Sequence, residues 1–150
     1  MSGDVAMRTL GDNFPVPTFD DPAWVIPKPL SEAKVAIVTS AAIHTSDDER
    51  FTQGDTTFRW IPRSSRDLIL GHWSPNFDRS GFVLDHNVVF PLDRLEELAA
   101  DGTIGSVADR HVAFAGNQPD DVATIIHDTG PAAAAQLAAD GVDVVLLTPV

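Results

Sequence analysis

Polar residues that could bind a ligand follow the apolar runs of this sequence, where strands are expected to end. Thr39 follows "KVAIV" and His72 follows "LILG". Gly116 follows "VAFA", and Thr148 follows "VVLL". Carboxyl ends of parallel strands meet at one edge of a sheet, where open α/β folds bind ligands. The sequence therefore predicts a ligand pocket at that edge.

Two histidines are the first candidates for chemistry. His44 lies in a long polar loop after the first strand, and His72 ends the second strand. Histidine can act as an acid, a base or a substrate donor near neutral pH. A solvated or structurally bonded histidine is the alternative reading for both. His111 and His127 are expected to be surface or packing residues.

The motifs give less support to a metal site, a phosphate-binding loop or a hydrolase active site. Asp85, His86 and Asn87 are metal-binding types, but neighbours in an extended segment point to opposite faces, so no metal site is expected there. No glycine-rich phosphate loop is present. Ser40 and His44 could belong to a small α/β hydrolase, although the chain has no nucleophile elbow.

Several elements that must position these residues have clear boundaries. Strands are predicted at "KVAIVT", "RDLILGH" and "RHVAFAGN", with a short extended stretch at "TTFRWIP". The final "VDVVLLTPV" is typical of a strand buried on both faces of a parallel sheet. A helix follows Pro91, with Leu92, Leu95 and Leu98 on one face and Gly102 at its end. A second helix has Thr129 as its predicted cap and Gly141 as its stop.

The order of these elements predicts an α/β fold with a parallel sheet, of Rossmann-like or flavodoxin-like type. Residues 34–150 are expected to form this domain. Residues 1–33 are expected to form an extended proline-rich arm whose aromatic side chains dock on the domain. Those side chains belong to Phe14, Phe19 and Trp24.

Composition narrows the possible partners. The chain has 10 Lys and Arg against 22 Asp and Glu, a net charge of -12, which repels nucleic acids and anionic membranes. No secretion signal or membrane-spanning run is recognisable, so a cytoplasmic protein is expected. There is no cysteine, so any thiol or selenol chemistry must come from outside these residues.

Five segments, taken together and in order, resemble the selenoprotein B component of the glycine, sarcosine, betaine and D-proline reductases. They are "VAIVTSAAIH", "GDTTFRWIP", "DHNVVFPLDRLEEL", "DGTIGSVADRHVAFAG" and "TGPAAAAQLAADGVDVVLLTP". The layout is closest to the smaller subunit of the proline enzyme. The resemblance runs from about residue 14 to Val150 and is carried by the ordered set of segments.

The resemblance implies reductive cleavage of a carbon–nitrogen bond in a small-molecule amine substrate. It also implies a partner subunit whose pyruvoyl group activates the substrate, and a nucleophilic selenocysteine or cysteine just after Val150. No cofactor is expected within this chain. The chain would then be the N-terminal part of a reductase subunit, incomplete at its C-terminal side and inactive alone. Its open sheet edge would favour a complementary C-terminal chain or an oligomer.

Three origins of the end at Val150 remain open. Selenocysteine is encoded by UGA, otherwise a stop codon, so translation without selenium decoding would end there. Proteolytic cleavage and a split subunit are the alternatives. A relative that retains the fold only to bind a ligand or build a complex is the second functional hypothesis.

The resemblance also implies which residues line the pocket. His44 and His72 are assigned to catalysis, with His44 as the best candidate for positioning substrate or assisting proton transfer. The residues assigned to substrate binding are Thr39, Asp85, Asn87, Gly116 and Thr148.

Overall fold

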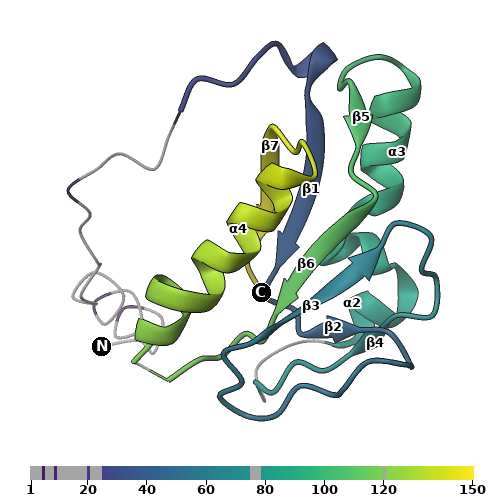
Figure 1. The fold of residues 1–150 in the computed structure, drawn as a ribbon. Helices are drawn as coiled ribbons and strands as arrows, with labels where there is room; N and C mark the ends of the chain where they lie inside the picture. Colours follow the sequence, from purple (N-terminus) through teal and green to yellow (C-terminus); the bar gives the residue numbers. More distant parts are fainter. Residues whose placement is uncertain (1–4, 6–8, 10–19, 21–24, 75–78, 120) are drawn as a thin grey trace.

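A mixed, mostly parallel sheet forms the centre of the molecule (Figure 1). The computed structural model describes residues 5, 9, 20, 25–74, 79–119 and 121–150. The strands of this sheet are β1 (Lys34–Thr39), β3 (Phe58–Pro62), β5 (Ser106–Val107), β6 (Arg110–Phe114) and β7 (Val144–Thr148). Val35 of β1 pairs with Val107 and with Val144, so β5 and β7 lie on opposite sides of β1. The predicted α/β class is confirmed.

The strand directions correct one part of the prediction. β5, β6 and β7 all run parallel to β1, whereas β3 is antiparallel to β6. The stretch "TTFRWIP" therefore belongs to the sheet, but it makes the sheet mixed. The carboxyl ends of β1, β6 and β7 still meet at one edge, as the sequence predicts.

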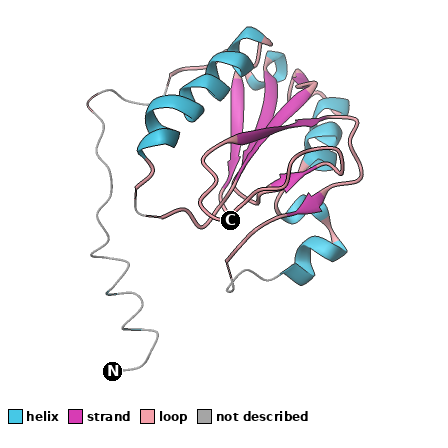
Figure 2. Cartoon of the chain, turned by 60° about the horizontal axis from the view of Figure 1, so that its bottom comes forward, coloured by secondary structure: helices cyan, strands magenta, loops and turns pink. Residues whose placement is uncertain are grey.

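Helices cover both faces of the sheet (Figure 2). α4 (Gly130–Ala139) packs on one face, where Ala133 and Leu137 contact Ala36 and Val112. The helices of the other face are α2 (Arg79–Leu84), the 3-10 turn η2 (His86–Val88) and α3 (Leu92–Ala100). They bury Phe82, Phe90, Leu92 and Leu95 with Ile37. Burial of these apolar side chains is the main force that holds the layers together.

The predicted helices form, with one difference at a terminus. α3 buries Leu92 and Leu95, and Gly102 after it has a positive φ of 80°. Gly141 likewise follows α4 with a φ of 76°, which glycine adopts without steric cost. Thr129 occupies the N-cap position of α4, as predicted, but its side chain makes no capping hydrogen bond, because the π-helical turn η3 (Ile125–Thr129) leads directly into the helix. Its hydroxyl donates instead to the Thr56 carbonyl.

Two segments differ from the strands expected of them. "RDLILGH" contributes only β4 (Ile69–Leu70), which is partly exposed and pairs antiparallel with β2 (Ile43–His44) outside the main sheet. The segment around His86, expected to be extended, forms α2 and η2. An apolar run alone does not show whether a strand lies inside a sheet, because its partners are distant in sequence.

The last strand, β7, is exposed rather than buried on both faces. Among the described residues it pairs only with β1, so its outer edge has no backbone partner. Val145 and Leu146 are exposed, and Leu147 is 65% exposed. The prediction of a strand at this segment is confirmed, but the prediction that it is buried on both faces is wrong. No described strand pairs with the outer edge of β7.

Before β1, the structure describes Val5 and Thr9 as helical and residues 25–29 as neither helix nor strand. The 3-10 turn η1 (Leu30–Glu32) precedes β1, and Val25 and Ile26 are exposed. Phe14, Phe19 and Trp24 of the predicted arm lie outside the described residues. None of the helices in the described ranges is long and apolar enough to cross a membrane.

A bulge between β5 and β6 is filled by a histidine side chain. In β1, Val35 and Val38 are three residues apart. Their partners on the other side, Val107 and Val112, are five residues apart. Two additional residues therefore interrupt the ladder. The Ile37 amide donates to Nδ1 of the fully buried His111 at 3.0 Å, so a ring nitrogen takes the place of a strand carbonyl. His111 is a packing residue, as predicted.

Candidate functional site

The main candidate site is a pocket of about 360 Å³ near the carboxyl ends of the parallel strands. The short β2–β4 pair and the loop after β2 build its wall. The lining residues are His44, Arg50, Phe51, Ile69, Leu70, Gly71, His72, Trp73 and Arg79. The structure thus brings together the two histidines that the sequence assigns to catalysis.

His44 presents an acceptor nitrogen. Its Nδ1 lies 3.2 Å from the Ala42 carbonyl, and because a carbonyl only accepts, Nδ1 carries the proton. In the neutral ring Nε2 then has a free lone pair. Nε2 is buried and has no hydrogen-bond partner within the described ranges. His44 is therefore arranged as a base or a hydrogen-bond acceptor.

His72 has the opposite tautomer. Its Nδ1 accepts from the Ser74 amide at 3.2 Å, so in the neutral ring Nε2 carries the proton. Nε2 lies 3.3 Å from the Val150 carbonyl and donates to it. Ser40 holds the same residue, because its Oγ accepts from the Val150 amide at 2.9 Å. His72 and Ser40 together fix the backbone that follows β7.

Gly116 makes this arrangement sterically possible. A Cβ atom at position 116 would lie 2.5 Å from the Ser40 carbonyl oxygen and 2.6 Å from Nε2 of His72. Only a residue without a side chain leaves both groups in place. Gly116 therefore shapes this edge of the sheet without needing to contact a ligand.

Ser40 does not form a hydrolase dyad with His44. Its hydroxyl is bonded to the backbone of Val150, and Nδ1 of His44 is bonded to Ala42. A serine nucleophile needs a histidine within hydrogen-bond reach. The geometry gives no support to the hydrolase alternative.

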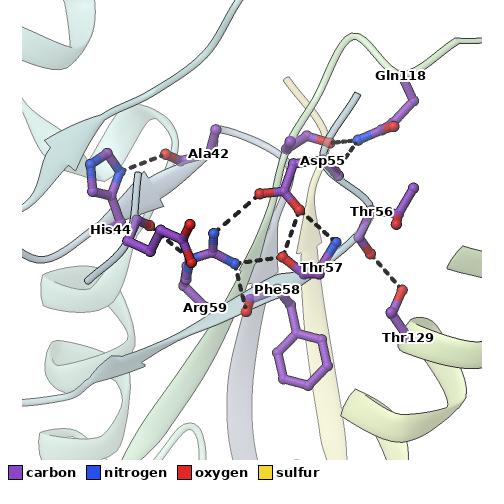
Figure 3. Close-up of polar contacts among 11 residues, drawn as sticks. Ala42, His44, Asp55, Thr56, Thr57, Phe58, Arg59, Gln118 and Thr129 are labelled. Carbon is purple, nitrogen blue, oxygen red and sulfur yellow. Dashed lines mark hydrogen bonds and ion pairs between the residues drawn. The ribbon is translucent and has the colours of Figure 1, made fainter. Parts of the chain in front are cut away.

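The long loop after β2 is held by Arg59 (Figure 3). The guanidinium donates to the Glu49 carbonyl at 2.9 Å and to Thr57 Oγ1 at 2.6 Å, and it pairs with Asp55 at 3.1 Å. It also lies 4.4 Å from the ring centroid of Phe51, a cation–π contact. These bonds fix the part of the loop that carries Arg50 and Phe51 into the pocket wall.

Asp55 is ionised in this network. Burial raises the pKa of its carboxyl, but hydrogen bonds from Thr57 and the charge of Arg59 outweigh that effect and lower the pKa below 3.8. Gln118 adds a bond to the Asp55 carbonyl at 2.7 Å (Figure 3). The loop is thus tied both to β3 and to the segment after β6.

Arg59→Lys is expected to loosen this loop. A lysine cannot reproduce the planar set of donors of the guanidinium group. The free energy of unfolding should therefore fall by about 1–2 kcal/mol. Amide hydrogen exchange over residues 45–57 should become faster. Arg94→Lys is the matched control, because Arg94 forms an exposed ion pair with Glu97. Unchanged exchange in the Arg59 variant would show that the loop is held by other contacts.

Thr39 and Thr148 lie at the predicted edge but outside this pocket. Both hydroxyls donate to the Val89 carbonyl, at 3.0 and 2.9 Å, and so join the ends of β1 and β7 to the segment after η2. They also line a separate cavity of about 220 Å³ with Ser40. Their predicted role in substrate binding stays a prediction.

Asp85 and Asn87 are not brought to the histidines. Asp85 accepts from the backbone and side-chain nitrogens of Asn87, which lowers the pKa of the Asp85 carboxyl. Asn87 in turn bonds to Asp93 at the start of α3. Neither residue lines the pocket, so their role in substrate binding also stays a prediction. In the described part of the chain no three His, Asp or Glu side chains gather to hold a metal ion.

Arg50 and Arg79 are the site residues that the sequence analysis missed. Arg50 stands in "SDDER", which is easily taken for a solvated acidic stretch, and Arg79 follows a segment without periodicity. The sequence feature that could have identified these two arginines is their charge. A strongly acidic chain has few arginines, so those near predicted ligand residues merit attention.

Comparisons with known proteins give matches to one family. The family model described as glycine/sarcosine/betaine reductase selenoprotein B matches residues 6–150. The D-proline reductase subunit gamma of Acetoanaerobium sticklandii is 36% identical over 152 residues, covering 99% of this chain and 62% of that protein.

Two further relatives are components of larger proteins or complexes. The sarcosine reductase complex component B subunit beta of Peptoclostridium acidaminophilum is 31% identical, covering 90% of this chain and 32% of that protein. The glycine reductase complex component B subunit gamma of Carboxydothermus hydrogenoformans is 31% identical, with 92% and 34% covered. This chain thus spans only part of each relative. No solved structure gives a significant match.

Proposed function

Since the chain belongs to the glycine/sarcosine/betaine reductase selenoprotein B family, we propose that it forms the substrate-pocket part of a reductase subunit. The reaction would be reductive cleavage of a carbon–nitrogen bond. The substrate would be an amino acid or N-methylated amine of the class named in the relatives, such as D-proline, sarcosine or glycine.

The observation that carries the proposal is the pairing of two histidines with opposite tautomers. Nε2 of His44 can accept a proton or a hydrogen bond, whereas Nε2 of His72 donates one. Groups of opposite character around one pocket suit a reaction in which a nitrogen must be held and then released with a proton. His44 would accept from the substrate nitrogen.

His72 and Ser40 would act through the backbone. They hold Val150 at the sheet edge, near the pocket that His72 also lines. In this proposal the nucleophilic selenocysteine or cysteine lies directly after that residue, in a continuation or a complementary chain. The held backbone suits this role, because a reacting side chain must be positioned to a fraction of an ångström.

A pyruvoyl-containing partner subunit belongs to the proposal. The pyruvoyl group would supply an electrophilic carbonyl for the substrate nitrogen. The residues of this chain that would face it are His44 and the pocket wall, because they surround the space where that nitrogen would lie. The names of the relatives support assembly into a multi-subunit complex.

Turnover by the native complex that contains this chain tests the proposal. The complex should consume D-proline, glycine, sarcosine or betaine when a dithiol supplies electrons, and mass spectrometry should find a pyruvoyl group in a partner subunit. His44→Gln should lower kcat at least tenfold, the effect of losing one hydrogen bond to the substrate. His127→Gln is the control, because His127 is exposed in η3.

Two results would overturn the proposal. One is an assembled complex that consumes none of these substrates, which would favour a non-catalytic ligand-binding or complex-forming module. The other is a gene that stops after Val150 with no complementary reading frame for the rest of the subunit. An in-frame UGA or cysteine codon there, followed closely by another cysteine codon, would support it.

A further inference from the structure

Two arginines in the pocket wall differ from most of the other basic residues that the structure describes. Most of the described lysines and arginines are paired with carboxylates. The ion-paired ones are Lys28, Arg59, Arg63, Arg66, Arg94 and Arg110. Arg50, Arg79 and Lys34 form no ion pair within the described ranges, and of these three only the two arginines line the pocket. Carboxylate partners are abundant here, with 22 acidic residues in the sequence, so their absence beside both arginines is informative.

The surroundings of these arginines favour a small anion with an apolar body. The net charge of -12 repels anions, so a site for one needs local positive charge. Phe51, Leu70 and Trp73 provide apolar and aromatic walls in the same pocket. A guanidinium binds a carboxylate through two parallel N–H···O bonds, a geometry that lysine cannot offer.

Arg79 is already oriented by the site. One of its terminal nitrogens donates to the His72 carbonyl at 2.6 Å, which leaves its other donors for a ligand. Arg50 follows the Glu49 carbonyl that Arg59 holds, so the loop network fixes the backbone beside it. The two arginines come from different elements, one from the loop after β2 and one from the start of α2, and both line the pocket.

We propose that Arg50 and Arg79 form the subsite that binds the carboxylate of the substrate. This inference rests on the proposed function and names the residues that would recognise the feature common to amino-acid substrates. With the carboxylate on the arginines, the nitrogen of the same molecule would lie toward His44, which lines the same pocket. The pocket would then select for a free carboxylate, while the group around the nitrogen could vary.

Binding of D-proline and D-prolinamide to the 150-residue chain tests this subsite. The two probes share a ring and a nitrogen, but only proline carries a carboxylate. Titration followed by NMR should show proline binding at least tenfold more tightly than the amide. Arg50→Gln and Arg79→Gln should each weaken proline binding about tenfold or more and leave amide binding unchanged, since an ionic hydrogen bond is worth about 1.5–3 kcal/mol.

The controls separate the subsite from general effects of charge and folding. Arg94→Gln removes an equal charge on the exposed face of α3 and should leave both affinities unchanged. Arg50 is exposed and bonds to no described side chain, so Arg50→Gln should fold normally even if loss of the Arg79–His72 bond destabilises Arg79→Gln. Inorganic phosphate should compete weakly with proline if any small anion can occupy the site.

Distinct results decide the subsite and the proposed function. Equal affinity for proline and its amide, or proline binding within twofold of wild type in Arg50→Gln, would overturn the subsite. An unchanged KM of the Arg50→Gln variant, in a complex that does reduce amino acids, would also overturn the subsite. The proposed function would survive that result. Arginine-dependent proline binding in a complex without any turnover would retain the subsite and overturn the reductase function.

Discussion

Replacing His111 with alanine is expected to lower the free energy of unfolding by about 3–4 kcal/mol. The ring is fully buried and packs edge-on against Phe90, with 5.3 Å between ring centroids. Its loss leaves a cavity and also leaves the Ile37 amide without its acceptor. A loss of this size is a large fraction of the stability of a domain, which is typically about 5–15 kcal/mol.

The same histidine should make stability depend on pH. Burial, aided by the charge of Arg63, lowers the pKa of His111 to about 4, although Glu96 acts in the opposite direction. In the unfolded chain the pKa returns to about 6.5, so between these values the unfolded state binds more protons. The free energy of unfolding should therefore fall as the pH falls through this window, by about 2 kcal/mol between about pH 7.5 and about pH 5.

Urea unfolding at the two pH values measures this effect. His111→Asn keeps an acceptor near the position of Nδ1 but cannot titrate, so its unfolding free energy should change less with pH than that of the wild type. The aspartates with lowered pKa lose their contribution only below about pH 4, outside the window. They are Asp55, Asp85, Asp101, Asp140 and Asp143. Identical pH dependence in the two proteins would contradict the assignment to His111.

Gly116→Ala is the second substitution from which a large effect is expected. The added methyl group would overlap the Ser40 carbonyl and the ring of His72. The φ angle of Gly116 is not in the left-handed region, so the cost is steric and not conformational. We expect a loss of about 2–3 kcal/mol in unfolding free energy, together with displacement of His72 from the Val150 carbonyl.

A double-mutant cycle separates the two contacts of Gly116. In a His72→Ala background the methyl group meets only the Ser40 carbonyl, so Gly116→Ala should cost less there than in the wild type. Nitrogen chemical shifts of the His72 ring should also change in Gly116→Ala, because its Nε2–H loses its acceptor. Gly81→Ala is the control, since a Cβ there meets nothing closer than 3.8 Å. Equal costs in both backgrounds would exclude strain against His72.

The residue pattern was sufficient to predict the elements whose ends are marked by their own residues. β1 is a compact β-branched run, and α3 has leucines at helical spacing with Gly102 after it. The burial of β7 was predicted wrongly, because burial depends on neighbours and not on composition. The prediction for β4 was wrong for a similar reason, since its one strand partner among the described residues is a two-residue strand that follows β1.

The site was predictable in position but not in its full chemistry. His44 and His72 were found because they follow strand-like segments, and the fold does bring them into one pocket. The tautomer of each ring depends on backbone groups that only the fold supplies, namely the Ala42 carbonyl and the Ser74 amide. Arg50 and Arg79 come from segments without regular periodicity, so no pattern placed them in the wall.

β3 and β7 both lie at edges of the sheet, but they differ in how their free edges are protected, and this affects how the protein behaves in solution. β3 carries Arg59 and ends at Pro62, which has no amide hydrogen to offer another chain, whereas β7 reads "VVLLT" and has neither safeguard. The net charge of -12 keeps copies apart, but its reach shortens to about 10 Å at 0.1 M salt. Colloidal stability is therefore set by ionic strength and by whatever covers this single five-residue strand.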